Sequence, residues 1–147
     1  MMAKLRVLFV CIHNSARSQM AEAFLKFHGR DGYEVESAGI EPGSLNPLVV
    51  EAMNEVGIDI SANRTKDVGD FLKQGKWFNY VITVCDETAA ERCPVFPGAV
   101  KRLHWGFPDP SALKGTREET LAQIRKIRDA INSAVQKFVK ENAAASS

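Results

Sequence analysis

The chain has 147 residues, of which 45% are hydrophobic and 25% are charged, and its net charge is +1. This length and composition are typical of one globular domain with a sizeable core, which we expect to span residues 1–147. The near-neutral charge excludes a general electrostatic attraction to nucleic acid or to a membrane surface. No apolar run reaches the ~20 residues of a membrane span.

The N-terminus does not resemble a signal peptide, so we expect a cytoplasmic location, and we expect a monomer. In that compartment three cysteines favour catalysis, redox work or metal binding over structural disulfides. Their spacing fits no zinc pattern.

Apolar stretches typical of strands alternate with amphipathic stretches typical of helices. The predicted strands are Leu5–Val10, Tyr33–Ala38, Tyr80–Val84 and Val100–His104. The predicted helices are Ala16–His28, Pro47–Val56, Val68–Lys76, a short Glu87–Arg92 and a long Arg117–Lys140. This order indicates an α/β fold, a single doubly wound domain with a four-stranded parallel sheet and helices on both faces.

The first two long helices carry start and stop signals. Ser15 is the expected N-cap of the first helix and Gly29 its stop. Its apolar residues recur at helical spacing: Met20, Ala23, Phe24 and Phe27. In the second helix Asn46 is the expected N-cap, followed by Pro47 at the first helical position and Gly57 at the end.

The last helix has the clearest pattern. Thr116 and Glu119 form a capping-box pair. An apolar stripe follows, which we expect to be core: Leu121, Ile124, Ile127, Ile131, Val135, Phe138 and Val139. Its basic residues favour a solvated face over a binding patch: Arg125, Lys126, Arg128 and Lys137.

Cys11 follows the first predicted strand. A loop that ends a strand and starts a helix directs several N–H groups at one anion, and the helix adds its positive end. That field favours the thiolate of Cys11, and the guanidinium of Arg17 can bind a tetrahedral oxyanion through two N–H groups. A Cys-x5-Arg spacing by itself is weak evidence for such a site, and the alternative is a cysteine buried in the core. The strand-loop-helix setting favours a nucleophile in an oxyanion site, whose residues are Ile12, His13, Asn14, Ser15, Ala16, Arg17 and Ser18.

Doubly wound folds bind ligands outside the carboxyl ends of their strands. Cys11 follows the first strand, Cys85 the third and the segment Trp105–Pro110 the fourth, so we expect all three at one edge of the sheet. Asp109, in that last segment, is a candidate general acid. The alternative, an aspartate that caps a turn, is common, and strand order favours the catalytic interpretation.

Cys85 and Cys93 lie eight residues apart. If the intervening stretch is helical, their sulfurs are about 12 Å apart along the axis. A disulfide requires Cα atoms within about 7 Å, so the pair cannot bond unless the segment unwinds. The two are therefore either unrelated thiols or part of a segment that moves.

Several polar residues are predicted near or behind the loop. We expect Asn14 to hold the loop through bonds from its side chain to the backbone. Glu22 is near the apolar face of the first helix, where a buried carboxylate needs either a cation or a hydrogen-bond network, and the sequence favours the network. Ser37 and Asp67 are two further candidates, and His13 is expected to point to solvent.

Six segments together resemble a known family: Val10–Ala23, Ser37–Ile40, Val56–Ser61, Thr83–Cys85, Cys93–Pro94 and His104–Pro110. They are similar to the thioredoxin-coupled arsenate reductases, which share the low-molecular-weight protein tyrosine phosphatase fold. The resemblance covers about residues 5–140.

The resemblance implies a role for each candidate. Cys11 would attack arsenate, Arg17 and the loop backbone would bind it, with phosphate or sulfate as analogues, and Asp109 would be the general acid. Cys85 would attack the arsenic adduct, releasing arsenite and leaving a Cys11–Cys85 disulfide. Cys93 would then attack Cys85, and thioredoxin would reduce the resulting Cys85–Cys93 disulfide.

The resemblance implies no tightly bound cofactor except a possible potassium ion. Its expected ligands are Asn14, Glu22, Ser37 and Asp67. The chain departs from the family pattern at Ile12-His13, where Thr-Gly is frequent, and at Ala16, where cysteine is frequent. The spacing from Cys85 to Cys93 is one residue longer than in close relatives.

Two other functions use the same loop. A phosphatase would form a Cys11-phosphate that water hydrolyses with help from Asp109. It would usually carry a tyrosine soon after Asp109-Pro110, where this chain has Ser111-Ala112, and it has no need of further cysteines. A non-catalytic anion sensor is disfavoured because the nucleophile, arginine and acid are all present.

Overall fold

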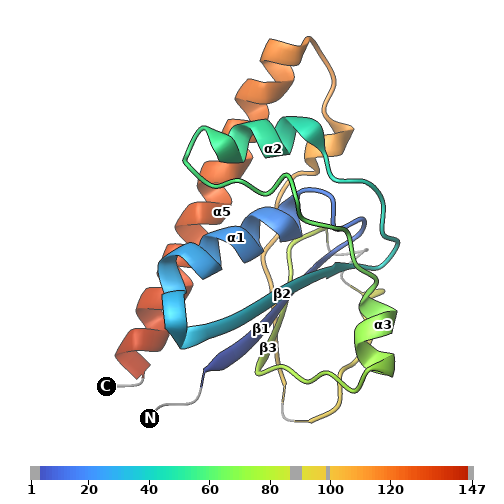
Figure 1. The fold of residues 1–147 in the computed structure, drawn as a ribbon, viewed down its shortest axis with the longest axis vertical. Helices are drawn as coiled ribbons and strands as arrows, with labels where there is room; N and C mark the ends of the chain where they lie inside the picture. Colours follow the sequence, from blue (N-terminus) through green and yellow to red (C-terminus); the bar gives the residue numbers. More distant parts are fainter. Residues whose placement is uncertain (1–3, 87–90, 99, 146–147) are drawn as a thin grey trace.

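The computed structural model describes residues 4–86, 91–98 and 100–145 (Figure 1). Its centre is a four-stranded parallel sheet in the order β2-β1-β3-β4. The strands are β1 Leu5–Cys11, β2 Tyr33–Gly39, β3 Tyr80–Thr83 and β4 Lys101–His104. The predicted single α/β fold is therefore confirmed, with each strand boundary within one residue of its expected place.

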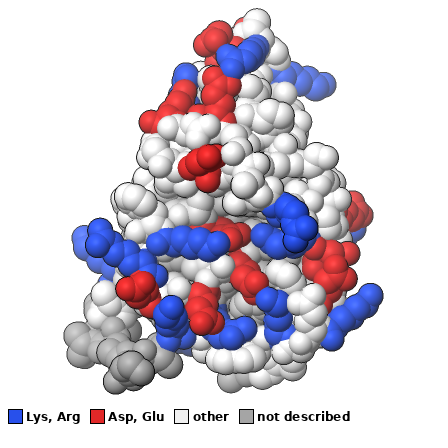
Figure 2. All heavy atoms as spheres, in the orientation of Figure 1, with Lys and Arg blue, Asp and Glu red and all other residues white. Residues whose placement is uncertain are grey.

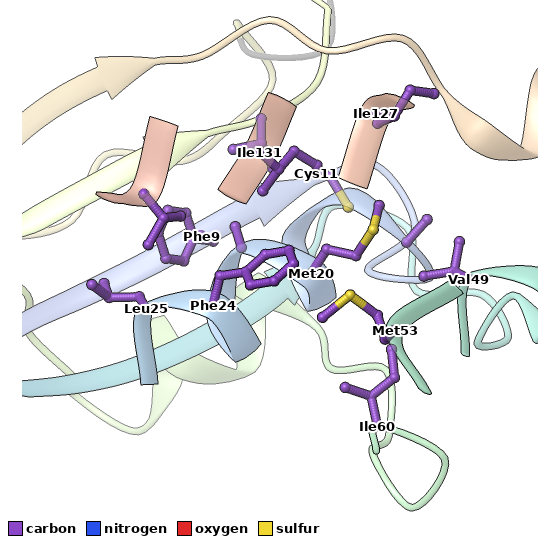
Figure 3. Close-up of a cluster of buried hydrophobic side chains, with 14 of the residues drawn as sticks. Phe9, Cys11, Met20, Phe24, Leu25, Val49, Met53, Ile60, Ile127 and Ile131 are labelled. Carbon is purple, nitrogen blue, oxygen red and sulfur yellow. The ribbon is translucent and has the colours of Figure 1, made fainter. Parts of the chain in front are cut away.

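Helices cover both faces of the sheet because the side chains of the central strand alternate between them. The helices are α1 Arg17–Gly29, α2 Pro47–Asn54, α3 Val68–Lys73 and α5 Arg117–Ala145, with short 3-10 turns η1 Arg30–Gly32 and η2 Pro110–Ala112. Phe9 and Cys11 pack in a large cluster with α1, α2 and α5 (Figure 3). Leu8 and Val10 pack in a second cluster that includes Phe71 of α3.

The capping signals of two helices are confirmed. Asn46 Oδ1 accepts a hydrogen bond from the Leu48 amide at 3.0 Å, and Pro47 opens α2. Thr116 and Glu119 exchange two hydrogen bonds of 3.1 Å at the start of α5. Six residues of the predicted stripe on α5 are buried and Val139 is partly buried: Leu121, Ile124, Ile127, Ile131, Val135 and Phe138. The helix continues five residues past its predicted end.

Three local predictions were wrong. Ala16, not Ser15, precedes α1, and no side chain caps that helix because its first turn opens on the loop after β1. Phe27 is 61% exposed although it follows the buried Met20 by two helical turns, since it lies in the last turn of α1. Arg128 is buried, because its guanidinium joins α5 to α2 through bonds of 2.9 Å to the Ala52 carbonyl and to Glu55.

The predicted short helix Glu87–Arg92 falls mainly on residues 87–90, which lie outside the described part of the chain. None of the described helices is long and apolar enough to cross a membrane. On the face shown in Figure 2, basic and acidic side chains lie among one another and neither sign forms a separate field.

Candidate active site

The loops that follow three neighbouring strands meet at one edge of the sheet, as the strand order predicts. The ladder continues past β3, since the Val84 amide bonds to the Val10 carbonyl at 2.9 Å and the Trp105 amide to the Thr83 carbonyl at 2.8 Å. Cys11 and Cys85 lie in the same buried cluster. Two thiols separated by more than seventy residues of sequence are thus brought to one place.

The loop from Cys11 to Ala16 turns its carbonyl groups outward. Their hydrogen-bond donors are, in chain order, the Ile40 amide at 3.1 Å, the Glu41 amide at 2.7 Å, the Gly43 amide at 3.0 Å, Gln19 Nε2 at 3.1 Å, the Asn46 amide at 3.0 Å and the Met20 amide at 2.9 Å. Because the carbonyls face away, the N–H groups face the concave side. The amides of Ile12, His13, Ser15 and Ala16 bond to nothing within the described residues, so they remain available to an anion.

The backbone of this loop requires special residues at two points. An added Cβ at Gly39 would lie 2.8 Å from the Ile12 carbonyl oxygen, so only glycine lets the loop rest on the end of β2. Asn14 has a positive φ of 53°, which asparagine tolerates better than most residues. His13 needs no left-handed backbone, since Asn14 and Arg30 are the only described non-glycine residues with positive φ. His13 is exposed, as expected, and its Nδ1 lies 2.8 Å from the Glu41 carbonyl oxygen.

The sulfur of Cys11 has two hydrogen-bond partners. The Asn14 amide donates to it at 3.1 Å, and Ser18 Oγ lies 2.9 Å from it. Ser18 Oγ accepts from Asn14 Nδ2 at 2.7 Å, which directs its own hydrogen to the sulfur. Two donors to one sulfur stabilise the thiolate, the form that acts as a nucleophile.

Asn14 holds the loop as expected, and through more contacts than the sequence suggested. Its Oδ1 accepts from the Lys66 amide at 3.0 Å and from Gln19 Nε2 at 3.2 Å. Gln19 is fully buried and also donates to the Arg64 carbonyl at 3.0 Å. Ser18 was predicted only as part of the oxyanion loop, and the contact of its hydroxyl with the sulfur and the roles of Gln19 and Lys66 were not predicted. The available signal was a pair of polar residues in the first turn of a helix that packs on the core.

Arg17 and Asp109 face each other beside the loop. Arg17 is buried, and its Nη1 donates to the Phe107 carbonyl at 3.1 Å, which holds the guanidinium in place. Its Nη2 lies 3.9 Å from Asp109 Oδ2. Asp109 Oδ1 accepts from the Ser111 amide at 2.9 Å. The two interpretations of Asp109 are therefore compatible, because one carboxylate oxygen caps the turn while the other faces Arg17.

The three thiols are free and buried, and they divide between the two faces of the sheet. Cys85 is in the cluster of Cys11, whereas Cys93 is in the cluster on the other face. Burial raises the pKa of Cys85 to about 11, against a smaller lowering by Arg17. Burial also raises the pKa of Cys93, which Arg102 partly offsets. Both are protonated thiols at neutral pH.

The four expected potassium ligands do not come together as a group of oxygens that is free to bind an ion. The hydroxyl of Ser37 donates to Glu22 Oε1, so two of them meet. Asn14 Oδ1 is occupied by the two donors named above, and Asp67 Oδ1 caps α3 by accepting from the Gly69 amide at 2.7 Å. The Nζ of Lys66 lies 3.5 Å from Glu22 Oε1. These residues do not fit a potassium site, because a lysine ammonium already lies at the buried carboxylate.

The sequence model of the low molecular weight phosphotyrosine protein phosphatases matches residues 6–146. The chain therefore belongs to this family, whose fold is the one described above.

Within the family the chain is a member of the arsenate reductases. The arsenate reductase of Shouchella clausii (strain KSM-K16) is 46% identical over 141 residues, which cover 95% of this chain and 98% of the relative. A solved arsenate reductase in its oxidized state superposes with a TM-score of 0.75 at 29% identity, over 92% of this chain and 97% of that one. The thioredoxin-dependent arsenate reductase of Corynebacterium glutamicum superposes with a TM-score of 0.63 at 30% identity, over 92% of this chain and 63% of that one.

Proposed function

We propose that the protein reduces arsenate to arsenite, with Cys11 as the nucleophile and Cys85 and Cys93 as successive resolving thiols. The observation that carries the proposal is the burial of Cys85 in one cluster with Cys11, at the end of the neighbouring strand. A phosphatase that uses water as its second nucleophile requires no such thiol. The sequence similarity to arsenate reductases supports the same choice.

In the first step the Cys11 thiolate attacks arsenic, and an arsenic–oxygen bond breaks. The loop amides and Arg17 bind the remaining oxygens, and Asp109 protonates the leaving oxygen. The product is a Cys11–arsenic(V) adduct.

In the second step Cys85 attacks the sulfur of Cys11. The sulfur–arsenic bond breaks and its electron pair stays on arsenic, which leaves as arsenite. Arsenic gains two electrons, and the two thiols lose two electrons and two protons as the Cys11–Cys85 disulfide forms. Cys85 must lose its proton to attack. Burial raises the pKa of Cys85, but the nearby positive charge of Arg17 acts in the opposite direction and assists the loss of the proton.

In the third step Cys93 attacks Cys85, which frees Cys11 and forms a Cys85–Cys93 disulfide. Because Cys93 is buried on the opposite face of the sheet, it must leave its cluster before the two sulfurs can meet. We expect thioredoxin to reduce this disulfide, and the similarity to a thioredoxin-dependent arsenate reductase supports that choice of reductant. The three-thiol cycle then closes without any metal or organic cofactor.

The test is arsenate-dependent oxidation of NADPH in the presence of thioredoxin and thioredoxin reductase. Cys85→Ser and Cys93→Ser are each expected to abolish turnover, while slow hydrolysis of an aryl phosphate persists, because it needs only Cys11 of the three cysteines. In a single turnover without reductant, Cys93→Ser is expected to release one arsenite per protein and Cys85→Ser none. Normal turnover by Cys93→Ser would overturn the relay, and equal rates with a small monothiol would overturn the choice of thioredoxin.

A further inference from the structure

Glu22 carries a buried charge behind the loop that holds Cys11. Its side chain is 8% exposed, and a carboxylate in such a place requires compensation. Oε2 is 2.5 Å from Lys26 Nζ, on the exposed side of α1. Oε1 accepts from the Ser37 hydroxyl and lies 3.5 Å from Lys66 Nζ.

Lys66 reaches this carboxylate from a different part of the chain. Its Nζ also lies 3.4 Å from Ser37 Oγ, so the ammonium contacts an oxygen of α1 and an oxygen of β2 together. A carboxylate and a hydroxyl are the kind of oxygen ligands that a hard cation takes. An ammonium group is a compact positive charge of similar size to a potassium ion, and it satisfies the same oxygens through its N–H donors.

The backbone of Lys66 is joined to the catalytic loop. Its amide donates to Asn14 Oδ1 at 3.0 Å, and its carbonyl accepts from the Gly39 amide at 2.7 Å. Asn14 in turn donates to Ser18 Oγ and, through its amide, to the sulfur of Cys11. An ion pair at one end of Lys66 thus fixes the segment whose other contacts orient the donors to the thiolate.

We propose that Lys66 is an internal cation that replaces a bound potassium ion, and that it positions Cys11 through Asn14. The protein then needs no metal ion behind its loop. Lys66 is a positioning residue, since it does not itself touch the reacting sulfur.

The first experiment compares thermal unfolding in potassium, sodium and tetramethylammonium chloride at equal ionic strength. The wild-type protein is expected to unfold at one temperature in all three salts. Lys66→Ser is expected to lower that temperature by about 2–6 °C in tetramethylammonium, and potassium is expected to restore part of the loss. The matched control is Lys76→Ser, which removes a lysine of similar exposure from an ion pair with Glu36 and is expected to show no potassium response.

The second measurement is the rate of alkylation of Cys11 in a Cys85→Ser, Cys93→Ser background. Lys66→Ser is expected to slow alkylation about threefold to tenfold, with recovery in Lys66→Arg or in potassium, and Lys76→Ser is expected to leave it unchanged. In the thermal unfolding experiment, a potassium-specific stabilisation of the wild-type protein would overturn the inference. That comparison uses the wild-type protein alone, so it does not depend on any variant being folded. Unchanged alkylation in Lys66→Ser would overturn the positioning role.

Discussion

The hydroxyl of Ser18 is the group whose removal tests the thiolate site most directly. Ser18→Ala deletes one of the two partners of the Cys11 sulfur and leaves the Asn14 amide in place. A hydrogen bond to a charged group contributes about 1.5–3 kcal/mol, and each 1.4 kcal/mol is about a tenfold change in an equilibrium. We therefore expect the equilibrium between thiolate and thiol at Cys11 to shift toward the thiol about tenfold to a hundredfold.

The assay uses the Cys85→Ser, Cys93→Ser background, in which Cys11 is the only remaining cysteine of the three. The thiolate is followed by its ultraviolet absorbance and by its rate of reaction with iodoacetamide across pH. Ser111→Ala is the control, because it removes an exposed hydroxyl that bonds to Asn46 at 3.2 Å and lies outside the loop. An unchanged thiolate fraction in Ser18→Ala would refute the reasoning, since the amide alone would then suffice.

Three further predictions rest on single groups. Burial raises the pKa of Cys85 from 9.0 to about 11, so between these pH values the folded protein keeps a proton that the unfolded chain has released. The stability that this thiol contributes is complete below pH 9 and is lost as pH rises through 11. In urea unfolding, the free energy of unfolding of Cys85→Ala should therefore decline less steeply than that of the wild type between pH 9 and 11. Asp109→Asn should slow the first chemical step about 10²–10⁴-fold in a single-turnover measurement. Arg128→Ala should lower the free energy of unfolding by about 1–3 kcal/mol because the buried Ala52 carbonyl loses its partner, whereas Lys126→Ala, on the exposed face, should change it by less than about 0.5 kcal/mol.

The order of strands and helices, the edge at which the site lies and the loop after β1 could all be predicted from the sequence. Periodicity and capping are local properties, so α2 and α5 begin where Asn46 and Thr116 predict. The failures share a physical cause. Ser15 has the chemistry of an N-cap, but its carbonyl is held by Asn46, 31 positions along the chain, and Arg128 was expected in solvent because its partner on α2 is not its neighbour in sequence.

By itself the sequence determined which groups are present: a nucleophile in a strand-loop-helix motif, an arginine, an acid and two further cysteines. Tertiary structure alone decided how these groups are arranged, because contacts between distant segments set each orientation. The pairing of β1 with β3 brings Cys85 to Cys11, and the two faces of the sheet keep Cys93 apart from both. The segment before α3 packs against α1 and β2 and places Lys66 at the buried carboxylate of Glu22. The local sequence did not indicate this pairing, because charge compensation in a protein interior depends on proximity in space.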